Sequence, residues 1–383
     1  MSEFSIKGTE TQLLKSKKIA LGITGSVACV RAPQIARDLM RQGAEVYPVM
    51  TKSAQKLIGK DLLEWACENE VVTELTGKIE HVKLGAGSDL VLVCPSTANT
   101  LSKIAQGIDD TTVTSTVTCA LGEGVPLIIV PAMHESMYTH PIVRENIEKL
   151  ESMGVSVIKP RLEEGKAKIA SNKEIANEVM SILSKKDLEG KKIVITGGPT
   201  YERIDACRGI INQSSGKMAC ALAEQAEMRG ADVAFVYGPG KETPRKAIKV
   251  TNAEEMIEKT LGELADADVL ISVAAIADYS PKSLKGKLDS GKELALELKK
   301  NPKLLELARK KFPDKTIIGF KLEENIDEEK AGRLLKTADL VVANSVKAIN
   351  AETTEVLIKS KEKSRRVKAS KRELAGIILD EIK

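Results

Sequence analysis

The chain has 383 residues, of which 42% are hydrophobic, so it can build packed cores for about two domains of the usual ~100–200 residues. Its 58 basic and 54 acidic residues leave a net charge of only +4, which argues against a dedicated nucleic-acid binder. There is no apolar run of the ~18 residues that a membrane span needs, no apolar secretory segment and no C-x-x-C pair among the six cysteines. We therefore expect a cytoplasmic protein with reduced cysteines, no membrane contact and no nucleic-acid partner.

The first half alternates short apolar runs with helical segments. We predict strands at residues 19–23, 46–50, 90–94 and 127–130, and helices at 97–106, 111–121, 141–153 and 172–185. The third run, LVLVC, is almost continuously apolar, as in a strand that is covered on both faces. This alternation predicts an α/β fold with a doubly wound parallel sheet, flavodoxin-like or Rossmann-like.

Around residues 184–192 the chain becomes polar, and then the pattern restarts. A basic pair, an apolar strand and Thr-Gly occur at residues 17–25 and again at residues 191–197. We place the boundary near residue 188, which gives domains 1–188 and 189–383. The second domain is also predicted to be Rossmann-like. Its expected strands are 193–196, 232–237, 269–273, 316–320 and 340–343, and its helices are 215–229, 253–265, 302–311, 327–337 and 371–382.

Small polar residues follow three strands of the first half. Gly25 and Ser26 follow the first strand, Ser53 follows the second, and Ser96 and Thr97 follow the third. Because the carboxyl ends of parallel strands meet at one edge, we expect these residues to line a ligand site that suits a phosphate. The first strand lacks a G-x-G-x-x-G sequence, which argues against a dinucleotide and hence a nicotinamide dehydrogenase.

Two of the three histidines lie near predicted strand ends. His81 is in EHVKLG, just before a strand, and His134 follows the fourth strand in PAMHESM. An imidazole can exchange a proton near neutral pH, as a general base requires, although a structural or surface role is the alternative for each. No Cys/His cluster has the spacing of a zinc site.

The segments GITGSVA, HVKLG, CPSTAN and PAMHESM together resemble the flavoprotein cysteine decarboxylases that act on phosphopantothenoylcysteine, over nearly all of residues 17–185. The resemblance implies a bound FMN that carries the redox step, with His81 as the catalytic base. The FMN would lie against Gly25, Ser26, Ser53, Ser96 and Thr97.

The chain departs from this family pattern at two places. His134 stands where the family has Asn in P-x-M-N; an imidazole can donate a similar hydrogen bond to the substrate carboxylate. The stretch 163–170 has no Cys where a family loop carries a proton-donating Cys, so Lys166, Lys168 or a hydroxyl elsewhere is left as the donor. Because of these two departures, a flavin domain that has lost its activity remains an alternative interpretation.

Polar groups gather at strand ends in the second half as well. The run NQSSGKM, residues 212–218, opens a helix with hydroxyls, free N–H groups and Lys217, which suits an anion. Its spacing is not that of a Walker P-loop, and a Ser-capped helix is the alternative. Asp278 follows another strand end, and Lys285 and Lys287 lie in the loop beyond it.

These motifs resemble the phosphopantothenate–cysteine ligase domain over most of residues 190–345. The marks are ITGGPT, Arg208 four residues before Asn212 of NQSSGKM, AAIADY, a loop lysine, KNP and GF. The order, decarboxylase then ligase, matches the bifunctional enzyme of coenzyme A biosynthesis in bacteria and archaea. That resemblance implies a homo-oligomer with trimeric flavin domains, often assembled into dodecamers, and dimeric ligase domains.

The implied reaction joins CMP from CTP to the carboxylate of 4′-phosphopantothenate, and the amine of cysteine then attacks the acyl cytidylate. Asn212 would hold the acyl intermediate with Arg208 nearby, Lys287 (or Lys285) would assist, and Mg²⁺ would accompany the triphosphate. The implied CTP site is Ser272, Val273, Ala274, Asp278, Lys287, Pro302, Lys303, Leu304, Leu305, Phe320 and Lys336. Gly332 stands where the family has a basic residue, for which Lys330 or Arg333 can substitute.

Two other functions stay open. One is an active ligase with an impaired flavin domain, and the other is a non-catalytic flavoprotein regulatory subunit. The ligase motifs argue against the second. The eight basic residues between 359 and 372 are interpreted as a solvated hairpin and helix start, with an anionic-ligand site as the alternative.

Overall fold

The computed structural model describes residues 5–382 with the exception of residues 243, 245, 283–285, 288–294, 349, 350 and 352. The chain forms two compact units, Met1–Ser184 and Lys185–Lys383. Within the described residues, no helix has the length and apolar character needed to cross a membrane.

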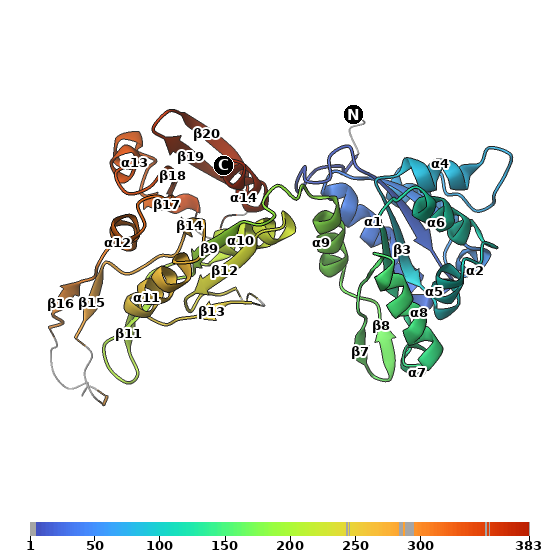
Figure 1. Cartoon of the computed structure of the whole chain (residues 1–383), viewed down its shortest axis with the longest axis horizontal. Helices are drawn as coiled ribbons and strands as arrows, with labels where there is room; N and C mark the ends of the chain where they lie inside the picture. Colours follow the sequence, from blue (N-terminus) through green and yellow to red (C-terminus); the bar gives the residue numbers. More distant parts are fainter. Residues whose placement is uncertain are drawn as a thin grey trace. The chain divides into compact units, whose positions relative to one another are not determined.

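The first unit is built on a parallel sheet in the order β2-β1-β3-β4-β6 (Figure 1). Its strands are β1 (Lys18–Ile23), β2 (Glu45–Met50), β3 (Leu90–Ser96), β4 (Leu127–Pro131) and β6 (Ser156–Val157). The chain passes from β1 to β2 on one side and then to β3 on the other, so the strand order reverses between β1 and β3. Flavodoxin-like sheets have this order and bind ligands at this switch point.

Helices cover both faces of this sheet, which explains why β3 and β4 are buried along their whole length. One layer holds α1 (Ala32–Arg41), α3 (Lys60–Cys67) and α9 (Asn172–Leu183). The other holds α4 (Glu80–Gly87), α5 (Ala98–Gln106), α6 (Thr112–Gly122) and α8 (Pro141–Ser152). The four helices predicted for this half are confirmed to within two residues.

Short elements complete the first unit. They are η1 (Val27–Arg31), α2 (Lys52–Gln55), α7 (Glu135–Tyr138) and a small antiparallel sheet of β5 (Met133–His134), β8 (Lys166–Lys168) and β7 (Arg161–Glu163).

The second unit contains an eight-stranded sheet in the order β13-β12-β9-β14-β17-β18-β19-β20. The strands are β9 (Lys192–Gly197), β12 (Asp232–Tyr237), β13 (Ile248–Lys249), β14 (Val269–Ser272), β17 (Thr316–Glu323), β18 (Leu340–Ser345), β19 (Thr353–Ser360) and β20 (Ser364–Ser370). The first six are parallel, and β19 and β20 extend the sheet as an antiparallel hairpin. The strand order reverses between β9 and β14, which gives this sheet a switch point too.

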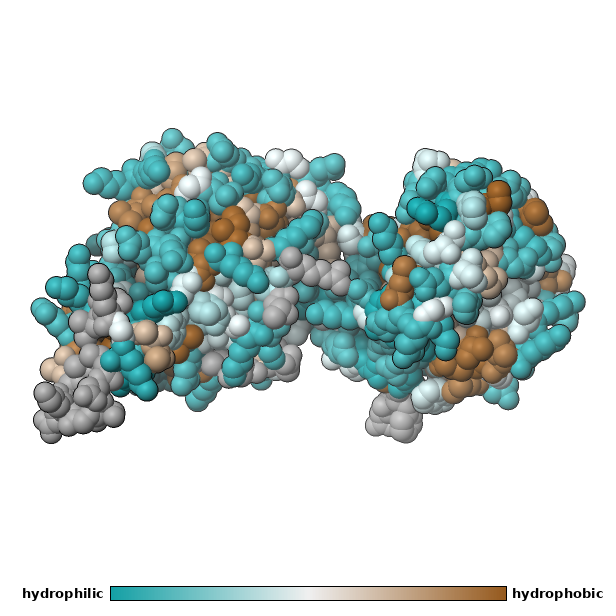
Figure 2. Space-filling model, turned by 90° about the horizontal axis from the view of Figure 1, so that it is seen from below, coloured by the Kyte–Doolittle hydropathy of each residue, from teal (hydrophilic) through white to brown (hydrophobic). Residues whose placement is uncertain are grey.

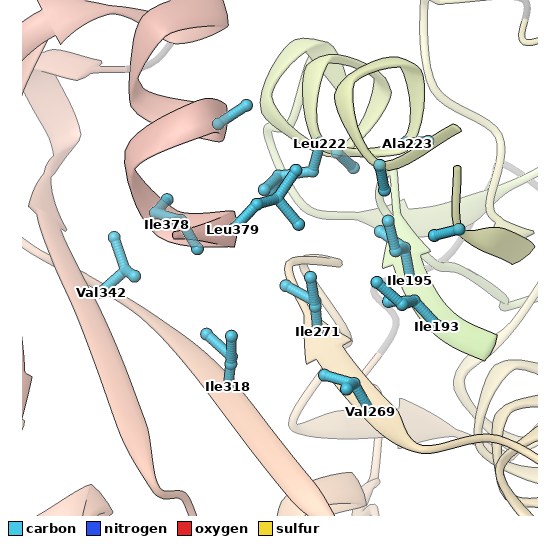
Figure 3. Packing of buried hydrophobic residues seen from close by; sticks show 14 of the residues in the cluster. Ile193, Ile195, Leu222, Ala223, Val269, Ile271, Ile318, Val342, Ile378 and Leu379 are labelled. Atoms are coloured by element: carbon cyan, nitrogen blue, oxygen red, sulfur yellow. The ribbon is translucent and has the colours of Figure 1, made fainter. Parts of the chain in front are cut away.

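Two layers of helices also enclose this sheet. On one face, α10 (Lys217–Met228) and α14 (Lys371–Leu379) pack over the strands, and Figure 3 shows Leu222 of α10 and Leu379 of α14 meeting above Ile195 and Ile271. On the other lie α11 (Ala253–Leu264), α12 (Leu304–Lys311) and α13 (Glu328–Leu334). The predicted α/β architecture is confirmed for both halves.

The helix predicted at 327–337 ends three residues early. Residues 335–337 instead form a turn, in which the Thr337 hydroxyl donates to the carbonyl oxygen of Leu334 over 3.1 Å. The predicted solvated hairpin is confirmed as β19 and β20, although it is also part of the main sheet.

Candidate functional site

Thr24 ties the ends of β1 and β3 together at the switch point of the first sheet. Its hydroxyl donates to the carbonyl oxygen of Pro95 (2.8 Å) and accepts from the backbone N–H of Thr97 (3.0 Å). The hydroxyl of Ser26 donates to the carbonyl oxygen of Ala132, at the end of β4, over 3.1 Å. The carboxyl ends of three strands are therefore held as one edge.

Gly25 lies directly against the turn that follows β2. A Cβ atom at Gly25 would lie 2.5 Å from the Cβ of Ser53 and 3.3 Å from its carbonyl carbon, so only glycine allows this approach. Ser53 is exposed, and Ser26 and Thr97 are half-buried. Ser96 is fully buried, and its hydroxyl donates to the carbonyl oxygen of Thr97 over 3.4 Å. The structure thus brings the five predicted residues to one edge, with the Ser96 hydroxyl turned to the backbone.

His81 lies in the first turn of α4, a helix that was not predicted and that leads into β3. The helix was not apparent because EHVKLGAG contains two glycines, which disfavour a helix. Gly85 is needed there because a Cβ atom would lie 2.5 Å from the carbonyl oxygen of Thr116 on α6. Since α4 leads into β3, its first turn lies toward the carboxyl edge of the sheet. The Nδ1 atom of His81 is buried and has no hydrogen-bond partner among the residues that the structure describes, which is unusual in a folded protein.

His134 is exposed at the end of β5, where it caps α7. Its Nδ1 accepts from the backbone N–H of Ser136 over 3.4 Å, so the proton of the neutral ring is assigned to Nε2. Lys166 is the cross-strand neighbour of His134 in the β5–β8 pairing. The loop that lacks the expected Cys therefore lies beside His134.

A cleft of about 810 Å³ opens at the carboxyl edge of the second sheet, next to the β9/β14 switch point. Ten of the residues predicted for the ligase site line it. They are Asn212, Ser272, Val273, Ala274, Asp278, Pro302, Lys303, Leu304, Leu305 and Phe320. Within the described residues, Lys287 and Lys336 are exposed and do not line this cleft, and Lys285 lies outside the described residues.

Thr196 has the same role in the second sheet as Thr24 in the first. Its hydroxyl oxygen accepts from the backbone N–H groups of Val273 and Ala274, each over 3.2 Å, and so ties the end of β9 to the segment after β14. The repeated Thr-Gly of the two halves thus has one physical cause, a hydroxyl that joins two strand ends at a switch point. The sequence analysis noted the repeat and missed this role.

Polar side chains also order the walls of the cleft. The Asn212 amide donates to the carbonyl oxygen of Ala275 (3.2 Å), and Lys303 pairs with Asp278 (2.5 Å). Asn344, which was not predicted, lines the cleft too, and so does Lys371 of the basic stretch 359–372, for which an anionic-ligand site was the alternative. Asn344 could have been found as a polar residue near the end of an apolar strand, LVVANS.

Arg208 lies in the hairpin of β10 (Tyr201–Arg203) and β11 (Gly209–Ile211) and does not line the cleft. Its Nε atom donates to Asp205 (3.0 Å), and the buried Asp205 carboxylate also accepts from the backbone N–H groups of Cys207 and Arg208, both at 2.7 Å. These bonds fix the hairpin that leads into Asn212.

Taken together, the fold and the two strand edges define a two-domain α/β protein with a candidate site at the switch point of each sheet. The chain matches the Flavoprotein family over residues 7–184 and the DNA/pantothenate metabolism flavoprotein C-terminal domain over residues 188–383. It is 45% identical to the coenzyme A biosynthesis bifunctional protein CoaBC of Thermococcus kodakarensis, over 98% of this chain and 97% of that protein. The Methanocaldococcus jannaschii protein of the same name is 40% identical, over 99% and 96%.

The chain therefore belongs to the family of bifunctional CoaBC proteins of coenzyme A biosynthesis, which confirms the decarboxylase–ligase resemblance drawn from its motifs. The solved C-terminal domain of a coenzyme A biosynthesis bifunctional protein CoaBC is 33% identical, with a TM-score of 0.46 over 52% of this chain and 96% of that one.

Proposed function

We propose that this chain converts 4′-phosphopantothenate, cysteine and CTP into 4′-phosphopantetheine, with the ligase in residues 189–383 and the decarboxylase in residues 1–188. The observation that carries the proposal is that each sheet places a polar site at its own switch point. In the second unit that site is the cleft that contains Asn212. In the first it is the edge formed by Gly25, Ser26, Ser53 and Thr97.

In the ligase, CTP lies in the cleft and transfers CMP to the pantothenate carboxylate, with release of pyrophosphate. Asn212 then holds the acyl group through its amide while the cysteine amine attacks. Arg208 and the loop lysine Lys287 assist from outside the cleft, on the hairpin and loop beside it. Oriented donors and cations of this kind stabilise the charge that develops during acyl and phosphoryl transfer.

Mg²⁺ accompanies the triphosphate in this proposal. Among the described residues, no group of three or more His, Cys, Asp or Glu side chains could hold a metal by itself. Mg²⁺ that is bound with nucleotide phosphates needs only one or two protein carboxylates. The carboxylates of Asp278 and Glu306 line the cleft, so this donor set fits.

FMN fits the edge of the first sheet. The sheet has the flavodoxin-like strand order, Gly25 allows the turn after β1 to lie directly against Ser53 at that edge, and the buried Nδ1 of His81 has no hydrogen-bond partner among the described residues. Bound there, the flavin supplies two-electron redox chemistry, and the protein orients the substrate and moves protons. His81 acts as the base, and the Nε2–H of His134 donates to the substrate carboxylate.

Lys166 is proposed as the proton donor that replaces the missing loop Cys. Lys168 is bound by Glu164 (2.8 Å) and Glu163 (3.3 Å), which raise its pKa and make it a weaker acid. Burial raises the pKa of the Cys67 and Cys94 thiols to about 12, so neither thiol can replace an acidic loop thiol as the proton donor.

We expect Lys166→Met to slow the decarboxylation by about 10²-fold or more, as for the loss of a general acid, and the matched variant Lys168→Met to change it less than threefold. Carbon dioxide release from phosphopantothenoylcysteine measures both. Equal rates for the two variants would assign the proton to another group.

The proposed enzyme is a cytoplasmic homo-oligomer with trimeric flavin units. Its cysteines are free, which suits a reducing compartment. Val27 and Val30, next to Ser26, are 76% and 63% exposed, and Figure 2 shows apolar residues gathered on one face of the first unit. Exposed apolar side chains of this kind are typical of a surface that another subunit buries.

The proposal as a whole is tested on the purified chain. We expect a yellow flavin spectrum and, with all three substrates, pyrophosphate, carbon dioxide and 4′-phosphopantetheine identified by mass. If the flavin-loaded protein ligates its substrates but releases no carbon dioxide, the alternative of an active ligase with an impaired flavin domain is favoured. If neither pyrophosphate nor carbon dioxide is released, the alternative of a non-catalytic flavoprotein regulatory subunit is favoured.

A further inference from the structure

The basic stretch at residues 359–372 has no part in the proposed reaction so far. Four of its eight cations pair with carboxylates of neighbouring elements. These pairs are Lys359–Glu328, Arg365–Glu381, Arg366–Glu355 and Arg372–Glu224. They account for half of these cations as ordinary surface charge. Lys371 also lines the cleft of the second unit.

The topology of the sheet carries Lys371 to this cleft. Strand β18 runs toward the carboxyl edge, β19 runs back from it, and β20 returns to it, because both strands pair antiparallel with their neighbours. The pairing of Thr353 with Ser370 places the end of β20 at the carboxyl edge. Helix α14 begins at that edge with Lys371 as its first residue.

The start of α14 is fixed by a capping box. The Ser370 hydroxyl accepts from the backbone N–H of Glu373, and the Glu373 carboxylate accepts from the backbone N–H of Ser370, both over 3.2 Å. Such a reciprocal pair holds the first turn of a helix in place. Lys371 is therefore presented by a defined helical turn, and its side chain is half-buried.

The rest of α14 is packed firmly on α10, and the two helices run in the same direction. Arg372 pairs with Glu224 at 3.6 Å, and farther along Arg229 pairs with Asp380 at 2.9 Å. Figure 3 shows Leu379 of α14 packed toward α10 above the sheet. Both helices thus direct their N-terminal ends, where the helix dipole is positive, toward the edge with the cleft.

The cleft carries more positive than negative side chains. Four lysines (Lys217, Lys303, Lys321 and Lys371) and two carboxylates (Asp278 and Glu306) line it. The Nζ atom of Lys303 forms an ion pair with Oδ1 of Asp278 at 2.5 Å, and the Nζ atom of Lys321 forms one with Oε1 of Glu323 at 3.1 Å. A cleft with this balance suits a ligand with several phosphate charges.

We infer that Lys371 binds a phosphate group of a ligase substrate, as a cation that the C-terminal helix contributes to the site. This inference rests on the proposed ligase function. The phosphate belongs either to the nucleotide triphosphate or to the 4′-phosphate of phosphopantothenate, which present the same chemistry to an ammonium group.

The test measures steady-state ligation by the full chain, with CTP and 4′-phosphopantothenate varied in turn. We expect Lys371→Met to raise the KM for one of the two substrates about 10- to 100-fold, the effect of losing a hydrogen bond to a charged group. The substrate whose KM rises is the one that carries the contacted phosphate. Lys371→Arg, which keeps the charge, should stay within about fivefold of the wild type.

The matched control is Lys361→Met, which removes the same charge from the exposed hairpin turn of this segment. Unchanged KM values for Lys371→Met, the same shift in Lys361→Met, or an equal loss in Lys371→Arg would each overturn the inference. A wild-type chain that releases no pyrophosphate would instead show that the proposed ligase function itself has failed.

Discussion

Replacing Asn212 by alanine is expected to lower the kcat of ligation by about 10²–10³-fold, the usual effect of removing one amide donor from a developing charge. The amide now donates to the carbonyl oxygen of Ala275 over 3.2 Å at the wall of the cleft, so it is already ordered where the acyl group would lie. Pyrophosphate release with CTP, 4′-phosphopantothenate and cysteine measures the loss.

Two controls separate a loss of chemistry from a loss of fold. Decarboxylation of phosphopantothenoylcysteine by the same preparation should be unchanged, because Asn212 belongs to the other compact unit. Asn325→Ala, at an exposed turn of the second unit outside the cleft, should ligate at the wild-type rate. An Asn212→Ala protein that ligates normally would remove Asn212 from the site.

The sheets could be predicted because their strands are buried on both faces and so appear as continuous apolar runs. Strand β3 is buried at every position, and its segment LVLVC is the plainest example. The grouping of the polar strand-end residues could be predicted from the same parallel sheet, because parallel strands bring their carboxyl ends to one edge. That rule placed Gly25 next to Ser53, whereas Asn212, which shares one cleft with Asp278, was assigned through the ligase resemblance.

Helix α4 could not be predicted because its signal is tertiary. Two glycines weaken its helical pattern, and the close contact of Gly85 with α6 is what makes glycine favourable there. The position of Lys371 in the lining of the cleft could not be predicted for a related reason. It depends on the register of β19 and β20, which returns the chain to the carboxyl edge, and a run of basic residues carries no information about that register.

Lys287 and Lys336 show the limit of transferring a site by motif alone. Both were assigned to the CTP site by resemblance to the ligase family, and both are exposed outside the lining of the cleft among the described residues. A lysine on a loop or at a helix end can reach a bound ligand only through its own long side chain, so its role depends on the ligand and is not fixed by the backbone.

The second large effect is expected from His81. We expect His81→Asn to slow decarboxylation by about 10²–10⁴-fold, because asparagine can form hydrogen bonds but cannot take up a proton near neutral pH. Carbon dioxide release measures the effect, while the flavin absorbance and the rate of ligation should stay at wild-type values. His140→Asn is the matched control, since His140 is exposed and its side chain makes no capping bond to α8.

The choice of asparagine makes the result decisive about proton transfer. The buried Nδ1 of His81 has no hydrogen-bond partner in the described part of the chain, so its hydrogen-bonding capacity is available for a bound flavin or substrate. If His81→Asn decarboxylates at the wild-type rate, His81 contributes a hydrogen bond and not a base, and another group must accept the proton. If the variant loses the flavin together with the activity, His81 holds the cofactor. Only slow decarboxylation with the flavin retained assigns the proton to this imidazole.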